Sequence, residues 1–193
     1  MTETELKYQL ESAADADRLG AILGDPDERR FLATRYWLPA TPRGAALRIR
    51  EVGGASEATV KRSGAAPTDG LFVHDERTEL LDAGDAVAFI SGQRPIDDLP
   101  LVAATGLQGP FRYVGLILTR RDVHRKNGLP LEIDRVTFPD GGEEFEVEVE
   151  TPDADARRSD LMALAVEAGV TLRPSTKTKL GRLLDRIDRE VRE

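Results

Sequence analysis

Charged side chains recur at every second position in several short segments of this chain. Glu3, Glu5 and Lys7 alternate in this way, and so do Arg48 and Arg50. Side chains at positions i and i+2 of a β-strand point to the same face of the sheet. Each segment is therefore predicted to be a strand with a row of charges on one face. The remaining rows are Thr59 with Lys61, Thr119 with Arg121, Glu132 with Asp134, and the row Glu144, Glu146, Glu148 and Glu150.

A single row of this kind is most simply a strand surface that faces water, where cross-strand ion pairs contribute ~0.2–1 kcal/mol each. Taken together, the rows favour a shared site over separate water-facing surfaces. Four glutamates on one strand repel each other and need positive partners. Hard divalent cations bind carboxylate oxygens, and Mg²⁺ usually combines one or two carboxylates with phosphate oxygens. Arg and Lys both bind phosphate. The pattern predicts a cavity for a metal-bound polyphosphate.

Composition limits the partners and the metal chemistry. The chain has 193 residues and a net charge of -8, from 27 Lys and Arg against 35 Asp and Glu. This acidic balance argues against general binding to nucleic acid or to anionic membranes. Without cysteine there is no thiolate metal site, and two histidines cannot form a His-rich one. Any bound metal is therefore expected to need oxygen ligands.

The sequence also predicts where the protein is located and what its histidines and two of its aromatic residues do. There is no run of about 20 apolar residues and no signal-peptide core, so we expect a soluble cytoplasmic protein. His74 and His124 are expected to be ordinary surface or structural residues. Tyr36 and Trp37 are expected to pack under a helix.

Eight segments have the alternation or β-branched content of strands, and short turns join most of them. Asn127-Gly128 is the strongest hairpin signal. Helices are expected over 13–24, in broken form over 82–109, over 159–168 with Ser159 as the N-cap, and after Pro174. This pattern predicts an α+β fold in one domain over 1–193, and about eight strands can close a barrel around one small ligand. The predicted strands are 2–10, 29–39, 45–52, 57–64, 71–81, 111–123, 129–138 and 143–150.

The order of these motifs resembles the CYTH family, also called triphosphate tunnel metalloenzymes, along essentially the whole chain. The family's Glu-x-Glu-x-Lys hallmark corresponds to Glu3, Glu5 and Lys7. The other matching segments are LRIRE for its Leu-Arg-x-Arg strand, TVK for its Thr-x-Lys strand, ERTEL for its Arg-x-Glu strand, the segment with Arg121 and Asp134, FEVEVE for its late Glu-x-Glu strand, and STKTKLGRLL for its C-terminal helix.

The resemblance implies an eight-stranded antiparallel β-barrel, the triphosphate tunnel, with flanking helices. It also implies roles for individual residues, with Glu3, Glu5, Lys7 and Asp134 as the catalytic set. Glu79 would be a supporting acid, although Glu76 competes for that place. Mg²⁺ or Mn²⁺ would be held by Glu3, Glu5 and two of Glu146, Glu148 and Glu150. Phosphate would be bound by Lys7, Arg48, Arg50, Lys61, Arg77, Arg121 and Lys179.

The expected function is metal-dependent hydrolysis of inorganic tripolyphosphate or of a small organic triphosphate, such as thiamine triphosphate or a nucleoside triphosphate. Two alternatives remain open at this point. One is an adenylyl cyclase that converts ATP to cyclic AMP and pyrophosphate. The other is a polyphosphate-binding module without catalysis. A homodimer is possible, because outward apolar faces could be covered by helices or by a second subunit.

Overall fold

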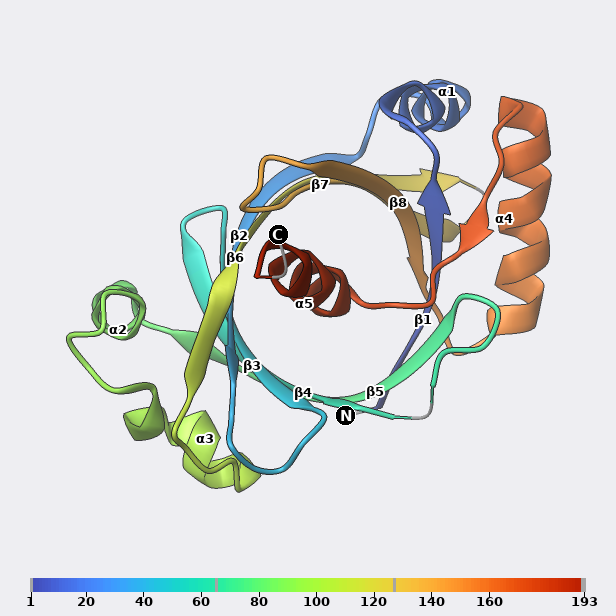
Figure 1. The fold of residues 1–193 in the computed structure, drawn as a ribbon. Helices are drawn as coiled ribbons and strands as arrows, with labels where there is room; N and C mark the ends of the chain where they lie inside the picture. Colours follow the sequence, from blue (N-terminus) through green and yellow to red (C-terminus); the bar gives the residue numbers. More distant parts are fainter. Residues whose placement is uncertain (1, 65, 127, 192–193) are drawn as a thin grey trace.

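Eight antiparallel strands form one closed barrel, which confirms the α+β fold expected from the sequence (Figure 1). The computed structural model describes residues 2–64, 66–126 and 128–191. The strands pair in the order β5-β4-β3-β2-β6-β7-β8-β1, and β5 also pairs with β1, which closes the ring. The barrel strands are β1 (Thr2–Leu10), β2 (Glu28–Leu38), β3 (Ala45–Val52), β4 (Ala55–Ser63), β5 (Leu71–Leu81), β6 (Arg112–Lys126), β7 (Leu129–Thr137) and β8 (Glu143–Glu150).

Along β1 the barrel turns apolar side chains outward and charged side chains inward. On β1, Leu6 and Tyr8 belong to an outer hydrophobic cluster, whereas Glu5 and Lys7 line the central cavity. Alternation along each strand produces the two faces. Helices must therefore cover the outside of the barrel, because apolar strand faces need burial.

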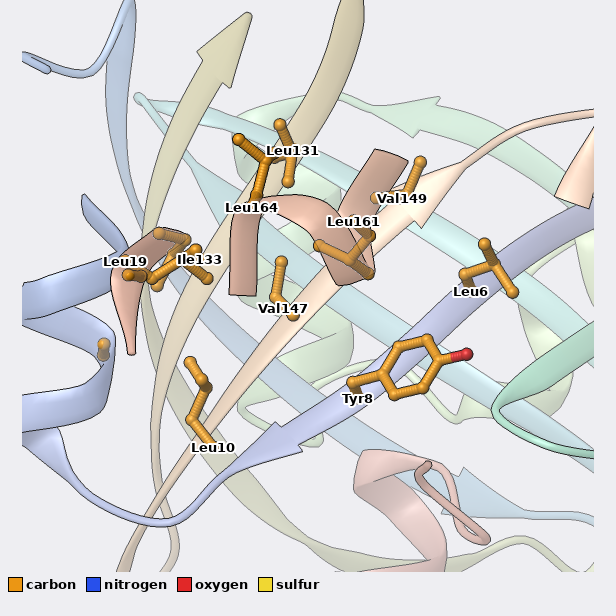
Figure 2. Packing of buried hydrophobic residues seen from close by; sticks show 12 residues of the cluster. Leu6, Tyr8, Leu10, Leu19, Leu131, Ile133, Val147, Val149, Leu161 and Leu164 are labelled. Atoms are coloured by element: carbon orange, nitrogen blue, oxygen red, sulfur yellow. The ribbon is translucent and has the colours of Figure 1, made fainter. Parts of the chain in front are cut away.

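Two helices cover the outer face around β1, β7 and β8. They are α1 (Ala13–Leu23) and α4 (Ala154–Ala168). Figure 2 shows Leu161 and Leu164 of α4 packed over Val147 and Leu131, with Leu19 of α1 beside Ile133. Burying a side chain of this size fully contributes about 1.5–3 kcal/mol. This cluster anchors the strands that carry the acidic rows.

A second outer cluster lies over β3 and β4. Leu47 and Ile49 of β3 pack there with Phe89 and Leu101 from the segment that follows β5. That segment contains α2 (Ala83–Ile90), a 3-10 turn η1 (Ile96–Asp98) and α3 (Pro100–Thr105), as the broken helical pattern predicted. The cluster fixes the strands that carry Arg48, Arg50 and Lys61.

The last helix, α5 (Lys179–Glu190), lies inside the ring of strands when the barrel is viewed along its axis (Figure 1). Thr178 caps its N-terminus by accepting a hydrogen bond from the backbone N–H of Gly181. Leu183 is fully buried against Tyr36, Ile117 and Val136, whose side chains face the barrel interior. The amphipathic pattern after Pro174 therefore places an apolar face against an inner wall.

The start of helix α4 and the turn between β6 and β7 were both predicted from the sequence. The helix predicted from Ser159 begins at Ala154, so the N-cap prediction was wrong. Asp153 is the cap, because its carboxylate accepts a hydrogen bond from the backbone N–H of Ala156. β6 and β7 pair as a hairpin, as predicted, but Asn127 of the expected turn lies outside the described residues. No helix in the described part of the chain is long and apolar enough to cross a membrane.

Candidate active site

The interior of the barrel contains a cavity of about 550 Å³ that is lined by charges of both signs. The cations are Lys7, Arg30, Arg48, Arg50, Lys61, Arg121 and Lys179, and the acids are Glu3, Glu5, Glu132, Glu148 and Glu150. Seven strands and α5 contribute these groups. The cavity is large enough for a small phosphorylated ligand.

Pairing between β1 and β8 brings two acidic rows together. Glu5 lies opposite Glu150 and Lys7 lies opposite Glu148 in the strand register. The Lys7 Nζ atom is 2.7 Å from Glu148 Oε1 and 3.2 Å from Glu5 Oε1. Burial alone would lower the pKa of Lys7, but Glu148 and Glu5 raise it above its ordinary value. Lys7 is therefore a fixed positive charge between two carboxylates.

Deeper in the barrel, three carboxylates form a compact cluster. Asp134 is fully buried and Glu146 is 1% exposed, and ligand oxygens of Asp134, Glu146 and Glu148 lie within 4.8 Å of one another. Such a group could hold a divalent metal. Lys179 reaches into it from α5, with its Nζ atom 2.8 Å from Asp134 and 2.9 Å from Glu148. Arg121 holds Asp134 through two hydrogen bonds of 2.7 Å.

A second acidic group surrounds Lys61. Its Nζ atom lies 3.2 Å from Glu3 Oε2 and 3.8 Å from Glu5 Oε1, and it also pairs with Glu76. Burial and the neighbouring carboxylate of Glu76 raise the pKa of Glu3 to about 7. The pKa of Glu76 falls to about 2: its burial acts against this shift, but Glu3, Arg48 and Lys61 outweigh it. One proton is thus retained in this group near neutral pH.

This proton leads to a testable pH dependence. Glu3 must lose its proton before its carboxylate can bind a cation, so metal affinity should rise as the pH increases through about 7. For one such group, the affinity should be about tenfold higher at pH 8 than at pH 6. Calorimetric titration with Mn²⁺ at both pH values measures this. The Glu3→Gln variant should lose the pH dependence, and an equal dependence in that variant would contradict the assignment.

Two arginines on β3 form the least neutralised part of the wall. Arg48 and Arg50 both point inward, and their nearest acids, Glu76 and Glu57, lie 3.5 Å away. Both Nε atoms are buried without a hydrogen-bond partner. Burial and the neighbouring Arg48 lower the pKa of Arg50. Guanidinium groups that face a cavity with unpartnered Nε atoms, and with acids no closer than 3.5 Å, are suited to bind an anion that arrives there.

Most of the predicted site residues lie in this interior, but two of them lie on the outside of the barrel. Arg77 lies on the outer face of β5 and donates a hydrogen bond to the carbonyl of Ala104 in α3. Glu79 lies on the same outer face and accepts from the backbone N–H of Leu101. The predicted phosphate role of Arg77 and supporting role of Glu79 are therefore wrong, because both side chains lie on the outer face of β5. Glu76 faces the interior instead.

The predicted acids of β8 occupy different depths. Glu146 is buried beside Arg182 of α5 and Lys179. Glu148 contacts Lys7, Arg121 and Lys179. Glu150 is exposed and lines both the central cavity and an outer pocket beside Thr2 and Pro152. The single row on β8 therefore runs from the buried cluster to an opening of the tunnel.

Four further residues line or support the interior, although none of them was among the predicted site residues. Arg30 and Tyr36 share the inward face of β2 and line the cavity. Their even spacing was visible in the sequence, but uncharged Leu32 and Thr34 separate them on that face. Arg182 holds Glu146 and Glu144 from α5. His74, expected to be an ordinary residue, also faces the cavity from β5.

His74 is buried beside both acids and cations. Its Nε2 atom lies 3.7 Å from Glu5 Oε1, and its ring centroid lies 5.7 Å from that of Phe72. Burial and the nearby Lys61 lower its pKa to about 4. The imidazole is therefore neutral at physiological pH.

Comparisons with known proteins agree with this geometry. The CYTH domain model matches residues 1–182. A candidate adenylyl cyclase from Hippeastrum, reported to have a dominant triphosphatase activity, has a solved structure with a TM-score of 0.80, 21% sequence identity and 95% coverage of each chain. A candidate adenylate cyclase from Bacillus halodurans gives a TM-score of 0.70 and 20% identity, with 94% of this chain and 97% of that chain covered. A search of curated proteins gave no significant match.

Proposed function

Because this chain belongs to the CYTH domain family, we propose that it is a metal-dependent triphosphatase. Its substrate would be inorganic tripolyphosphate or a small organic triphosphate, hydrolysed inside the barrel. The observation that supports this most is the pair Arg48 and Arg50, whose guanidinium groups have buried, unpartnered Nε atoms and face acidic rows across one cavity. A wall of cations opposite a wall of carboxylates matches a polyphosphate with a bound metal ion.

The donor set fits a divalent cation. Glu3 and Glu5 would hold it together with Glu148 and Glu150, the two acids of β8 that lie nearest to Glu5 in the strand register. Carboxylate oxygens are ligands for Mg²⁺ and Mn²⁺. When bound, the metal neutralises phosphate charge and activates water for attack on phosphorus. Asp134, Glu146 and Glu148 form the second acidic group that a metal could use.

The chain's own residues would position the substrate and stabilise its charge. Arg48, Arg50 and Lys61 bind phosphate oxygens from β3 and β4, while Lys7 and Arg121 do so from the opposite side. Phosphoryl transfer depends chiefly on such positioning and on stabilising the charge of the transferred group. Asp134 orients Arg121 through its two hydrogen bonds. Lys179 closes the inner end of the cavity from α5.

Product analysis tests the activity. ATP, thiamine triphosphate and tripolyphosphate are each incubated with the protein and Mg²⁺ or Mn²⁺, and phosphate, pyrophosphate and cyclic AMP are measured. Phosphate without cyclic AMP supports the proposal. Cyclic AMP with an equal amount of pyrophosphate would instead make the protein a cyclase. Binding without any product would leave a polyphosphate-binding module.

Ligand binding should also stabilise the fold. The Nε atoms of Arg48 and Arg50 lack hydrogen-bond partners, and a ligand that binds only the folded state raises its stability. At 100 times the Kd the gain is about 2.7 kcal/mol, or roughly 5–11 °C in Tm for a chain of this size. Differential scanning fluorimetry with Mn²⁺ plus tripolyphosphate measures this shift. An unchanged Tm at saturating ligand would contradict the proposed site.

A further inference from the structure

His74 lines the cavity but has no role in the proposed chemistry. It is 5% exposed, yet neither Nδ1 nor Nε2 has a hydrogen-bond partner. A buried polar group left unpaired costs about 1–3 kcal/mol. Packing against Phe72 explains the ring but not the two nitrogens, because an apolar side chain would pack there at lower cost. The imidazole therefore has unused bonding capacity at the cavity wall.

The surroundings of His74 indicate what could use this capacity. On β1, Glu3 is its direct partner in the strand register, and Glu5 Oε1 lies 3.7 Å from Nε2. The Lys61 ammonium lies near both glutamates, so a positive charge already occupies this corner. His74 thus lies in the acidic part of the cavity, where a cation is favoured over a phosphate oxygen.

The spacing also suits a metal ion. Two neighbouring ligand atoms of one ion, with bonds of about 2.1 Å, lie about 3.0–3.4 Å apart. The observed 3.7 Å from Nε2 to Glu5 Oε1 is only slightly longer, and a small side-chain rotation would close the difference. A neutral imidazole offers one lone pair, which is the form that binds metal.

We infer that His74 is a nitrogen ligand of the metal bound by Glu3 and Glu5, which makes this site a mixed nitrogen and oxygen site. The inference rests on the proposed function, because it assumes that a metal binds there. It replaces the expectation of purely oxygen ligands for this ion. Imidazole favours transition metals over Mg²⁺, so the site is selective for Mn²⁺ and its heavier neighbours.

Pulsed electron paramagnetic resonance of the full-length protein with one equivalent of Mn²⁺ tests the assignment. Direct coordination by His74 should produce electron spin echo modulation from ¹⁴N. Incorporation of ¹⁵N-histidine into wild-type protein should replace that modulation by the ¹⁵N pattern, which tests histidine coordination without any mutation. The chain contains only one other histidine, His124, on the outer wall beside Asp122.

Two matched variants assign the signal to one histidine. The modulation should persist in His124→Gln and disappear in His74→Gln. In His74→Gln, the ratio of Mn²⁺ affinity to Mg²⁺ affinity should fall about tenfold, which corresponds to ~1.4 kcal/mol. Circular dichroism and the Tm show whether each variant is folded.

The outcomes separate this inference from the function on which it rests. Bound Mn²⁺ without nitrogen modulation in wild-type protein, or modulation that persists in His74→Gln, would overturn the inference and leave the metal site intact. Absence of bound Mn²⁺ at saturating concentration would overturn both.

Discussion

Replacing Glu5 by Gln should reduce metal-dependent triphosphate hydrolysis by roughly 10²–10³-fold, the usual cost of removing one preorganised charge from a catalytic site. Glu5 is buried in the cavity, with Lys7 3.2 Å away and Lys61 3.8 Å away. Although burial opposes the shift, Lys7 and Lys61 lower the pKa of Glu5. Its carboxylate is therefore ionised and available to a cation. Gln has nearly the same shape but no charge.

The fold of Glu5→Gln should remain intact, because Lys7 keeps its contact of 2.7 Å with Glu148. Steady-state phosphate release and Mn²⁺ titration measure the effect. Glu11→Gln is the matched control, since Glu11 is an exposed acid just after β1 that pairs with Arg173. Surface pairs of this kind contribute little, so the control should keep full activity. Full activity in Glu5→Gln would refute the assigned metal site.

Replacing Lys179 by Met should destabilise the metal-free protein by about 3–5 kcal/mol, the typical cost of breaking a buried ion pair. Lys179 contacts all three carboxylates of the cluster Asp134, Glu146 and Glu148. Burial would lower the pKa of Lys179, but these carboxylates raise it above its ordinary value. Without the ammonium, three buried carboxylates lie within 4.8 Å of one another. The Tm should fall by about 6–20 °C.

A divalent cation should restore part of the stability that Lys179→Met loses, because it can replace the missing positive charge. Chemical unfolding with and without Mn²⁺ measures both effects. Lys177→Met is the matched control, since Lys177 is a half-exposed lysine two residues earlier that pairs with Asp185. If the two variants have the same stability, Lys179 does not hold the acidic cluster together.

Much of the fold follows from alternation in the sequence. Rows such as Glu144 to Glu150 predicted strands with one charged face, and the structure places such faces inside a closed barrel. Alternation alone does not say which face points inward. The combination of acidic and basic rows favoured a charged cavity, and the resemblance to a known family supported that direction.

The wrong site predictions arose where a short motif could be aligned with the family pattern at more than one position. On β5, His74 lines the cavity and Glu76 pairs with Lys61 and Arg48 inside the barrel. Arg77 and Glu79 contact α3 from the outer face. A shift of one residue reverses the face of every side chain, and nothing local in ERTEL fixes the register. Helix α4 shows a similar limit, because both Asp153 and Ser159 are acceptable caps and only packing decides between them.

The most direct test of the central claim is a ³¹P NMR time course of tripolyphosphate with the wild-type protein and Mg²⁺. If the charged tunnel hydrolyses a metal-bound triphosphate, orthophosphate and pyrophosphate should appear at equal initial rates, and a chelator should stop the reaction. Glu5→Gln should remain inactive under the same conditions. Tripolyphosphate, thiamine triphosphate and ATP that all stay intact with saturating Mg²⁺ or Mn²⁺ would contradict the account.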